Sequence, residues 1–290
     1  MGKQDSNAIG CISNSLNFSF TDYLGVPILK ITQIRNATVL LEFEAEGKNI
    51  GLLVDPMLSG RGVMPAFKYL GGSVRRHPTV ELPVNTPKLL QRVTHGLITH
   101  CQRAHVDHLD AAGTKFLRDG EVTVFCMLHD EAFLAKRGIL THALTTTITQ
   151  SFFHGHITPV PCVHGRGWVG HLMEHGHGYF IDLPGEPSVY IAGDTILTDE
   201  VRQCLMKRQP RVSILPAGGA QFDMGAEIIM NAEDVIEACS ITSGIVIANH
   251  LEALDHCPTT RVELRAASAQ AGLTKRLYIP DDGAEYSFRL

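Results

Sequence analysis

The chain has 290 residues, of which 44% are apolar and 19% are charged, and its formal net charge is −5. These values are typical of a globular chain with one large core or two small ones. Its Lys and Arg residues are scattered rather than clustered, which argues against a nucleic-acid-binding protein. Its apolar runs are all shorter than the roughly 18 residues that a membrane span needs.

Cysteine usage and the N-terminus indicate where the protein works. Seven cysteines, an odd number without regular spacing, argue for a reducing compartment rather than a disulfide framework. Residues 1–14 lack the charged and apolar regions of a signal peptide, so we expect a cytoplasmic protein. Residues 1–26 predict an irregular arm rich in Asn and Ser, and residues 27–290 are expected to form a single domain.

The N-terminal part predicts a meander of three strands at residues 27–32, 37–44 and 50–54. The polar run 46–49 predicts a hairpin turn in which Gly47 supplies the unusual φ angle.

A long Gly- and Pro-rich stretch, residues 57–87, predicts a loop that borders a site, because loops of this length are usually functional or disordered. Arg61, Arg75 and Arg76 in this stretch are better explained as solvated surface charge than as contacts to an anionic substrate.

Residues 96–110 hold the densest group of potential metal ligands, with His100, His105, Asp107 and His108 inside nine positions. The apolar run before them predicts the end of a buried strand, and Asp110 predicts the N-cap of the next helix. The group then lies at the carboxyl end of a strand, where open α/β sheets place their chemistry. A lone histidine is more often structural, but this many imidazole and carboxylate groups together suit a divalent metal such as zinc.

Three further candidates each follow a predicted strand: His164, Asp194 and His250. Asp194 has an alternative explanation as the N-cap of a helix at about residues 197–206. His154 and His156, just before His164, are interpreted as surface or rim residues. His256 is either a proton donor, a substrate contact or a surface residue before a helix.

The remaining elements are predicted from apolar periodicity and turn residues. Residues 169–183 predict two strands joined by a turn at 174–178. The other predicted strands and helices cover residues 122–127, 130–136, 157–163, 188–192, 212–215, 231–240, 245–248 and 260–271.

The segment Thr99-His100, followed by His105-Val106-Asp107-His108, resembles the T-H-x-H-x-D-H motif of the metallo-β-lactamase fold. That family has one residue between its first two histidines, whereas residues 101–104 separate them here. Strict spacing would put Arg103 in the first ligand position, and a guanidinium does not bind a cation. We expect instead that His100 binds from a longer loop. Residues 34–38 and 53–58 resemble the opening of the ascorbate-6-phosphate-lactonase-like branch.

The resemblance covers residues 27–288 and implies an α+β fold, an αββα sandwich. It implies two divalent metal ions, zinc with manganese or iron as alternatives, and it implies that Asp55 supports the metal loop from behind. One ion would be held by three histidines and the other by one aspartate and two histidines, with a second aspartate as the bridge. In that order, these residues are His100, His105 and His164, then Asp107, His108 and His250, then Asp194.

A metal-dependent hydrolase is the activity that this resemblance implies. Hydroxide formed at the metals, oriented by Asp107, would attack an ester, lactone, amide or phosphodiester bond of a small molecule, with Asp107 and His256 as the catalytic residues. The alternatives are a mononuclear or non-catalytic ligand-binding protein and a di-iron redox protein. We expect no nucleic-acid partner and no membrane span, and both a monomer and a homo-oligomer remain open.

Overall fold

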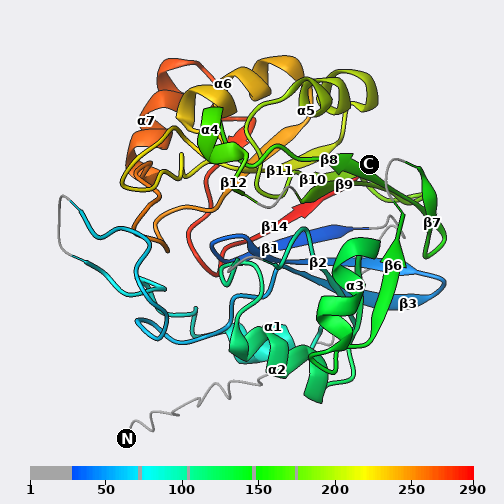
Figure 1. The fold of residues 1–290 in the computed structure, drawn as a ribbon. Helices are drawn as coiled ribbons and strands as arrows, with labels where there is room; N and C mark the ends of the chain where they lie inside the picture. The colour runs from blue at the N-terminus through cyan, green and yellow to red at the C-terminus, as the bar shows by residue number, and fades with distance from the viewer. Residues whose placement is uncertain (1–27, 71–73, 103–104, 146–147, 174–175) are drawn as a thin grey trace, which may run out of the picture.

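The computed structural model describes residues 28–70, 74–102, 105–145, 148–173 and 176–290 (Figure 1). The predicted arm, residues 1–26, and Arg103 lie outside these residues. In the described part, two seven-stranded sheets pack face to face, and helices cover the outer face of each sheet. This arrangement confirms the predicted αββα sandwich.

The first sheet has the strand order β14-β1-β2-β3-β4-β5-β6, antiparallel from β14 to β3 and parallel from β3 to β6. Its strands are β1 (Leu29–Arg35), β2 (Thr38–Ala45), β3 (Lys48–Val54), β4 (His95–Leu97), β5 (Thr123–Met127), β6 (Thr141–Leu144) and β14 (Glu285–Phe288). Glu46 and Gly47 form the predicted hairpin turn, and both have positive φ angles, 53° and 73°. Because β3 and β4 are parallel, the residues after each strand meet at one edge.

The second sheet repeats this pattern in the order β13-β12-β11-β10-β9-β8-β7, with a parallel half from β10 to β13 and an antiparallel half from β7 to β10. Its strands are β7 (Gln150–Phe152), β8 (Gly155–Pro161), β9 (His177–Asp182), β10 (Val189–Ile191), β11 (Val212–Pro216), β12 (Ile245–Asn249) and β13 (Leu277–Tyr278). It follows that β8, β10 and β12 all end at the same edge.

The core between the sheets is built from the inward-facing residues of the central strands, such as Leu41, Phe43, Ile181 and Ile214. Leu40 and Leu53 point the other way, toward Leu89 of a helix, so β2 and β3 are apolar on both faces. This explains why the stretch around Val39–Phe43 is almost continuously apolar instead of alternating.

Helices α1, α2 and α3 lie on the first sheet, and α5, a π-helical turn η1, α6 and α7 lie on the second (Figure 1). Their bounds are α1 (Thr86–Leu90), α2 (Ala111–Asp119), α3 (Leu128–Ala135), α4 (Gly167–Gly170), α5 (Asp199–Gln203), η1 (Cys204–Arg208), α6 (Ala232–Ile241) and α7 (Arg261–Gln270). Asp110 caps α2 by accepting a hydrogen bond from the Gly113 amide at 2.7 Å, as predicted. The cap of α5 is Thr198, so the alternative explanation of Asp194 as a helix cap is wrong.

The prediction of two strands in residues 169–183 is wrong. The chain forms the short helix α4 there and then the single strand β9. Gly165 and Gly167 have positive φ angles of 125° and 60°, which turn the chain away from the sheet. Trp168 and Val169 therefore do not form a strand of the sheet. The predicted turn at 174–178 lies partly outside the described residues.

The predicted long loop is present. We call residues 57–85 the rim loop; in its described part it contains no helix and no strand beyond an isolated bridge between Met64 and His77. Its arginines Arg61, Arg75 and Arg76 are exposed, in agreement with surface charge. The six cysteines in the described residues are buried, and none of them forms a disulfide. None of the described helices is long and apolar enough to cross a bilayer.

Candidate metal centre

The seven predicted metal ligands all lie at the edge where the strands of both sheets end. The loop between β4 and α2 supplies four of them from the first sheet, and the loops after β8, β10 and β12 supply the other three. The ligands from the first sheet are His100, His105, Asp107 and His108, and those from the second sheet are His164, Asp194 and His250. All seven side chains are buried. A core accepts this many polar groups only when they are paired or hold a metal.

The structure sorts these residues into two groups whose donor atoms lie within 4.8 Å of one another: His100, His105 and His164, and then Asp107, His108, Asp194 and His250. Oδ2 of Asp194 lies 3.1 Å from Nε2 of His108 and 3.3 Å from Nε2 of His250. The same oxygen lies 3.6 Å from Nε2 of His164 in the first group. Asp194 therefore stands between the two groups, where a bridging carboxylate belongs.

The longer spacing between His100 and His105 does not separate the two residues in space. Their ring centroids are 4.4 Å apart, and the His100 ring lies 5.4 Å from that of His164. The backbone of Gly176 packs directly on His100, since a Cβ atom at Gly176 would lie 2.7 Å from the Cβ atom of His100. A side chain at Gly176 would therefore push His100 out of its group.

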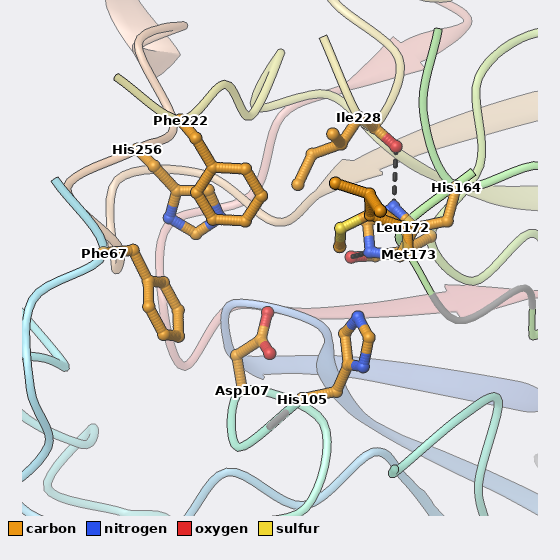
Figure 2. Close-up of a pocket in the computed structure, with 10 residues that line it drawn as sticks. Phe67, His105, Asp107, His164, Leu172, Met173, Phe222, Ile228 and His256 are labelled. Carbon is orange, nitrogen blue, oxygen red and sulfur yellow. Dashed lines mark hydrogen bonds and ion pairs between the residues drawn. The ribbon is translucent and has the colours of Figure 1, made fainter. Parts of the chain in front are cut away.

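Hydrogen bonds orient four of the histidines so that Nε2 faces the centre. His105 and His164 donate from Nδ1 to the carbonyl oxygens of Gln102 and Ile228, at 2.6 and 2.7 Å, because a carbonyl only accepts. The His164 bond is visible in Figure 2. His108 donates from Nδ1 to Asp55 at 2.9 Å. In the neutral ring this arrangement leaves Nε2 with a lone pair, the form that binds a metal.

Asp55 orients both groups at once. Its Oδ1 accepts from the Thr99 amide at 2.9 Å, and its Oδ2 accepts from the Thr99 hydroxyl at 2.6 Å and from His108. Because the Thr99 hydroxyl donates to Asp55, its lone pairs are free to accept from Nδ1 of His100, 3.1 Å away. Nε2 of His100 is then buried without a hydrogen-bond partner among the described residues. An orphaned, inward-facing imidazole nitrogen fits a metal site.

The electrostatics of the second group also fit a cation. Burial alone would raise the pKa of Asp107 and Asp194, but the neighbouring His108 and His250 hold both carboxyl pKa values below their usual range. Burial alone would lower the pKa of His108 and His250, but the carboxylates raise it above its usual value. A divalent ion would replace the protons that these histidines carry.

The first group behaves differently. Burial lowers the pKa of His100, and the other imidazoles lower it further. Burial likewise lowers the pKa of His164 to about 4. These imidazoles are neutral at pH 7, which is the state required of a metal ligand.

A cavity of about 210 Å³ opens onto the centre (Figure 2). His105, Asp107, His164 and Asp194 face it, so both groups are reached from one cavity. The remaining lining residues are apolar or aromatic: Phe67, Leu172, Met173, Phe222, Ile228 and His256. No Lys or Arg occurs among the described residues that line it.

His256 forms part of the cavity wall and is buried, which removes the interpretation as a surface residue. Its ring stacks parallel to Phe222 at 5.6 Å and meets Phe67 edge-on at 4.9 Å. Burial is the main cause that lowers its pKa to about 3, so the ring is neutral at pH 7. Its Nδ1 is buried without a hydrogen-bond partner among the described residues. A neutral imidazole can donate a hydrogen bond to a bound molecule. It is not suited to act as a protonated, positively charged general acid.

Several residues of the site carry no local signal in the sequence. Phe67 comes from the rim loop, far in sequence from the ligand loop, and Phe222 follows a glycine-rich turn after β11. His154 and His156 belong to neither ligand group, in agreement with their interpretation as surface or rim residues. His154 lies in the turn between β7 and β8, where it contacts the Pro184 carbonyl, and His156 is exposed on β8.

Comparison with known proteins supplies relatives over most of the chain, although no protein-family model matches it. It is 28% identical over 263 residues to the UPF0173 protein YddR of Bacillus subtilis (strain 168), covering 90% of this chain and 100% of that protein. It is 30% identical over 207 residues to a UPF0173 metal-dependent hydrolase of Methylobacterium nodulans, covering 69% of this chain and 76% of the relative.

Solved structures of hydrolases and of metallo-β-lactamase fold proteins also superpose on most of the chain. An isothiocyanate hydrolase from Delia radicum gut bacteria superposes with a TM-score of 0.76 and 30% identity, covering 90% of this chain and 100% of that one. The metallo-β-lactamase fold protein YhfI from Bacillus subtilis superposes with a TM-score of 0.60 and 13% identity, covering 90% of this chain and 100% of that one. The chain therefore has the metallo-β-lactamase fold.

Proposed function

The chain belongs to the UPF0173 metal-dependent hydrolase family, and from this premise we propose that it hydrolyses a small, uncharged molecule at an electrophilic carbon. We further propose that two divalent ions, zinc with manganese or iron as alternatives, are held by the seven ligands described above. The two donor groups with Asp194 between them support a dinuclear centre. They argue against a mononuclear centre and against a binding protein that has lost its metal.

The observation that carries the choice of substrate is the chemistry of the cavity wall. Phosphate groups are usually bound by Arg, Lys or a helix N-terminus. The described residues of this wall instead offer Phe67, Leu172, Met173, Phe222 and Ile228. We therefore favour a carbon electrophile, such as an ester, lactone, amide or isothiocyanate, over a phosphodiester. The same argument favours a lactone without a phosphate over the phosphorylated substrate that the lactonase-like branch suggests.

The likeness to the isothiocyanate hydrolase supports this substrate class, because the two chains are 30% identical in an alignment that covers 90% of this chain. An isothiocyanate carries its reactive carbon in a small uncharged group attached to an apolar body. A cavity of about 210 Å³ with aromatic walls suits such a molecule.

In the proposed reaction, different residues of the site would have different roles. When bound, the metal ions would supply Lewis acidity and lower the pKa of a water to about 7. Asp107 faces the cavity, so its ionised carboxylate is placed to orient the attacking water by accepting a hydrogen bond from it. His256 lies across the cavity and is placed to donate a hydrogen bond to the substrate. The apolar wall excludes bulk water.

Elemental analysis and a substrate panel test the proposal. Protein purified without added metal is expected to contain about two divalent ions per chain. It is expected to hydrolyse phenyl acetate, γ-butyrolactone or benzyl isothiocyanate in preference to bis(p-nitrophenyl) phosphate. Chelation should abolish the activity, and Asp281→Asn, which alters an exposed carboxylate paired with Arg265, should leave it unchanged. Protein that binds no metal, or that prefers the phosphodiester, would contradict the proposal.

A further inference from the structure

Four consecutive backbone amides of the rim loop are held by only two carboxylates. The amides of Phe67 and Lys68 donate to Asp255, each at 3.4 Å. The amides of Tyr69 and Leu70 donate to Oδ2 of Asp223 at 2.7 and 3.1 Å. In its described part the rim loop has no helix or strand of its own, and these bonds fix the path of residues 67–70 within it.

The Asp255 anchor is reinforced from the far end of the same loop. Nε2 of His77 lies 3.0 Å from Oδ1 of Asp255, and both side chains are almost fully buried. The Phe67 amide nitrogen lies 3.1 Å from the same Nε2, which donates to Asp255 and therefore does not accept from Phe67. The donor atoms of His77, Asp255 and His256 are close enough to hold a metal, but the Phe67 N–H already occupies the space between the first two. We therefore interpret this cluster as an anchor and not as a third metal site.

Each anchor is adjacent in sequence to an aromatic residue of the cavity. Asp255 directly precedes His256, and Asp223 directly follows Phe222. The ring of Phe67 packs between His77, at 4.6 Å, and His256, at 4.9 Å. Figure 2 shows Phe67, His256 and Phe222 on the same side of the cavity, opposite Leu172 and Met173.

We propose that Asp255 and Asp223 form a latch that fixes Phe67 as a wall of the substrate cavity, and that Phe67 thereby sets the size of the apolar group that the substrate can carry. Phe67 is the specificity-determining residue, and the two aspartates, with His77, are positioning residues. This inference rests on the proposed function, since it assigns the apolar part of the substrate to this wall. An ionised carboxylate suits the latch because it accepts several hydrogen bonds and donates none.

The first arm of the test changes the wall itself. Phe67→Ala is expected to raise the ratio of kcat/KM for benzyl isothiocyanate over that for allyl isothiocyanate by about tenfold, because hydrophobic pockets discriminate between groups of different size on this scale. Phe133→Ala is the matched control, since Phe133 packs on α3 against Arg137 and outside the cavity. An unchanged ratio in Phe67→Ala would overturn the assignment of Phe67.

The second arm releases the latch without changing the wall. Asp255→Asn leaves one acceptor oxygen and places an amide NH₂ against a backbone donor, because Phe67 and Lys68 donate to different oxygens of Asp255. The second variant is Asp223→Ala, because Tyr69 and Leu70 donate to the same oxygen of Asp223, which asparagine would keep. Hydrogen exchange of the amides of residues 67–70 is expected to quicken by about tenfold. The selectivity ratio should move in the same direction as in Phe67→Ala, through KM more than through kcat. Asp281→Asn is the carboxylate control. Unchanged exchange and unchanged selectivity in both latch variants would overturn the latch.

A third arm needs no turnover, so it separates the latch from the proposed function. Trp168 is the only tryptophan of the chain, and it lies in α4, just before the wall residues Leu172 and Met173. Its fluorescence can follow the binding of benzyl alcohol and of 1-propanol. If the native protein hydrolyses neither isothiocyanate and neither phenyl acetate nor γ-butyrolactone, the proposed substrate class fails. The latch then stands if both latch variants change amide exchange and the relative affinity for the two alcohols, and it falls if they change neither.

Discussion

Asp55→Asn should weaken both halves of the metal centre although Asp55 contacts neither ion position. The carboxylate accepts three hydrogen bonds, two from Thr99 and one from Nδ1 of His108. Asparagine keeps one acceptor oxygen and puts an NH₂ group in place of the other. If that group faces His108, two donors oppose each other, and His108 must either lose the bond or move its proton to Nε2.

The size of the effect follows from these contacts. Hydrogen bonds to charged groups contribute about 1.5–3 kcal/mol each. With one or two of the three bonds lost, the free energy of unfolding of the metal-free protein should fall by about 1.5–6 kcal/mol. Loss of a partner that orients a ligand typically weakens metal binding by about 10- to 100-fold. Both ions should be affected, because Thr99 passes the orientation on to His100.

Denaturant unfolding in EDTA and zinc titration of the refolded protein measure these two quantities separately. Asp110→Asn is the matched control, since Asp110 is equally buried and its oxygens accept from the amides of Gly113 and Ser59, each at 2.7 Å. Asparagine is also a good N-cap, so this variant should keep its metal, while loss of the Ser59 bond should cost about 1.5–3 kcal/mol of stability. Wild-type zinc affinity at both positions in Asp55→Asn would refute the reasoning.

Three further substitutions test individual roles at the centre. Asp194→Ala should lose metal and turnover together, and full metal content by elemental analysis would show that Asp194 is not the bridge. His100→Ala should weaken one ion selectively in a zinc titration while the second stays bound, and loss of both ions together would contradict the two-group arrangement. His256→Ala should lower kcat by about 10² with metal content unchanged, and steady-state kinetics identical to the wild type would remove His256 from the reaction.

Much of the fold could be predicted from the sequence, because its central strands are apolar and its helices begin with recognisable caps. Asp110, Asn231 and Thr260 each cap the helix that the sequence predicted after them. The short edge strands β6, β7 and β13 were not predicted, since two to four half-exposed residues show no period. The stretch around Trp168 was misassigned because its apolar residues pack beside the cavity and not in a sheet.

The site was predictable where chemistry is concentrated in a short segment or directly follows a strand. His164, Asp194 and His250 were assigned from the family resemblance together with their positions after strands that are evident from their apolar residues. The cavity wall was not predictable in this way. Phe67 reaches the cavity only through backbone hydrogen bonds to carboxylates that are distant in sequence, and such contacts leave no local pattern.

Each ligand group combines residues from both sheets, and this has a consequence for the order in which the protein matures. His100 and His105 come early in the chain but need His164, while Asp107 and His108 need Asp194 and His250. A ribosome that has made only the first sheet's central strands has therefore produced neither donor set in full. With the proposed ligands, the first group would be complete only after residue 164 and the second only after residue 250, and both only once the two sheets have docked. Bound ions would therefore stabilise the finished interface between the sheets rather than nucleate its folding.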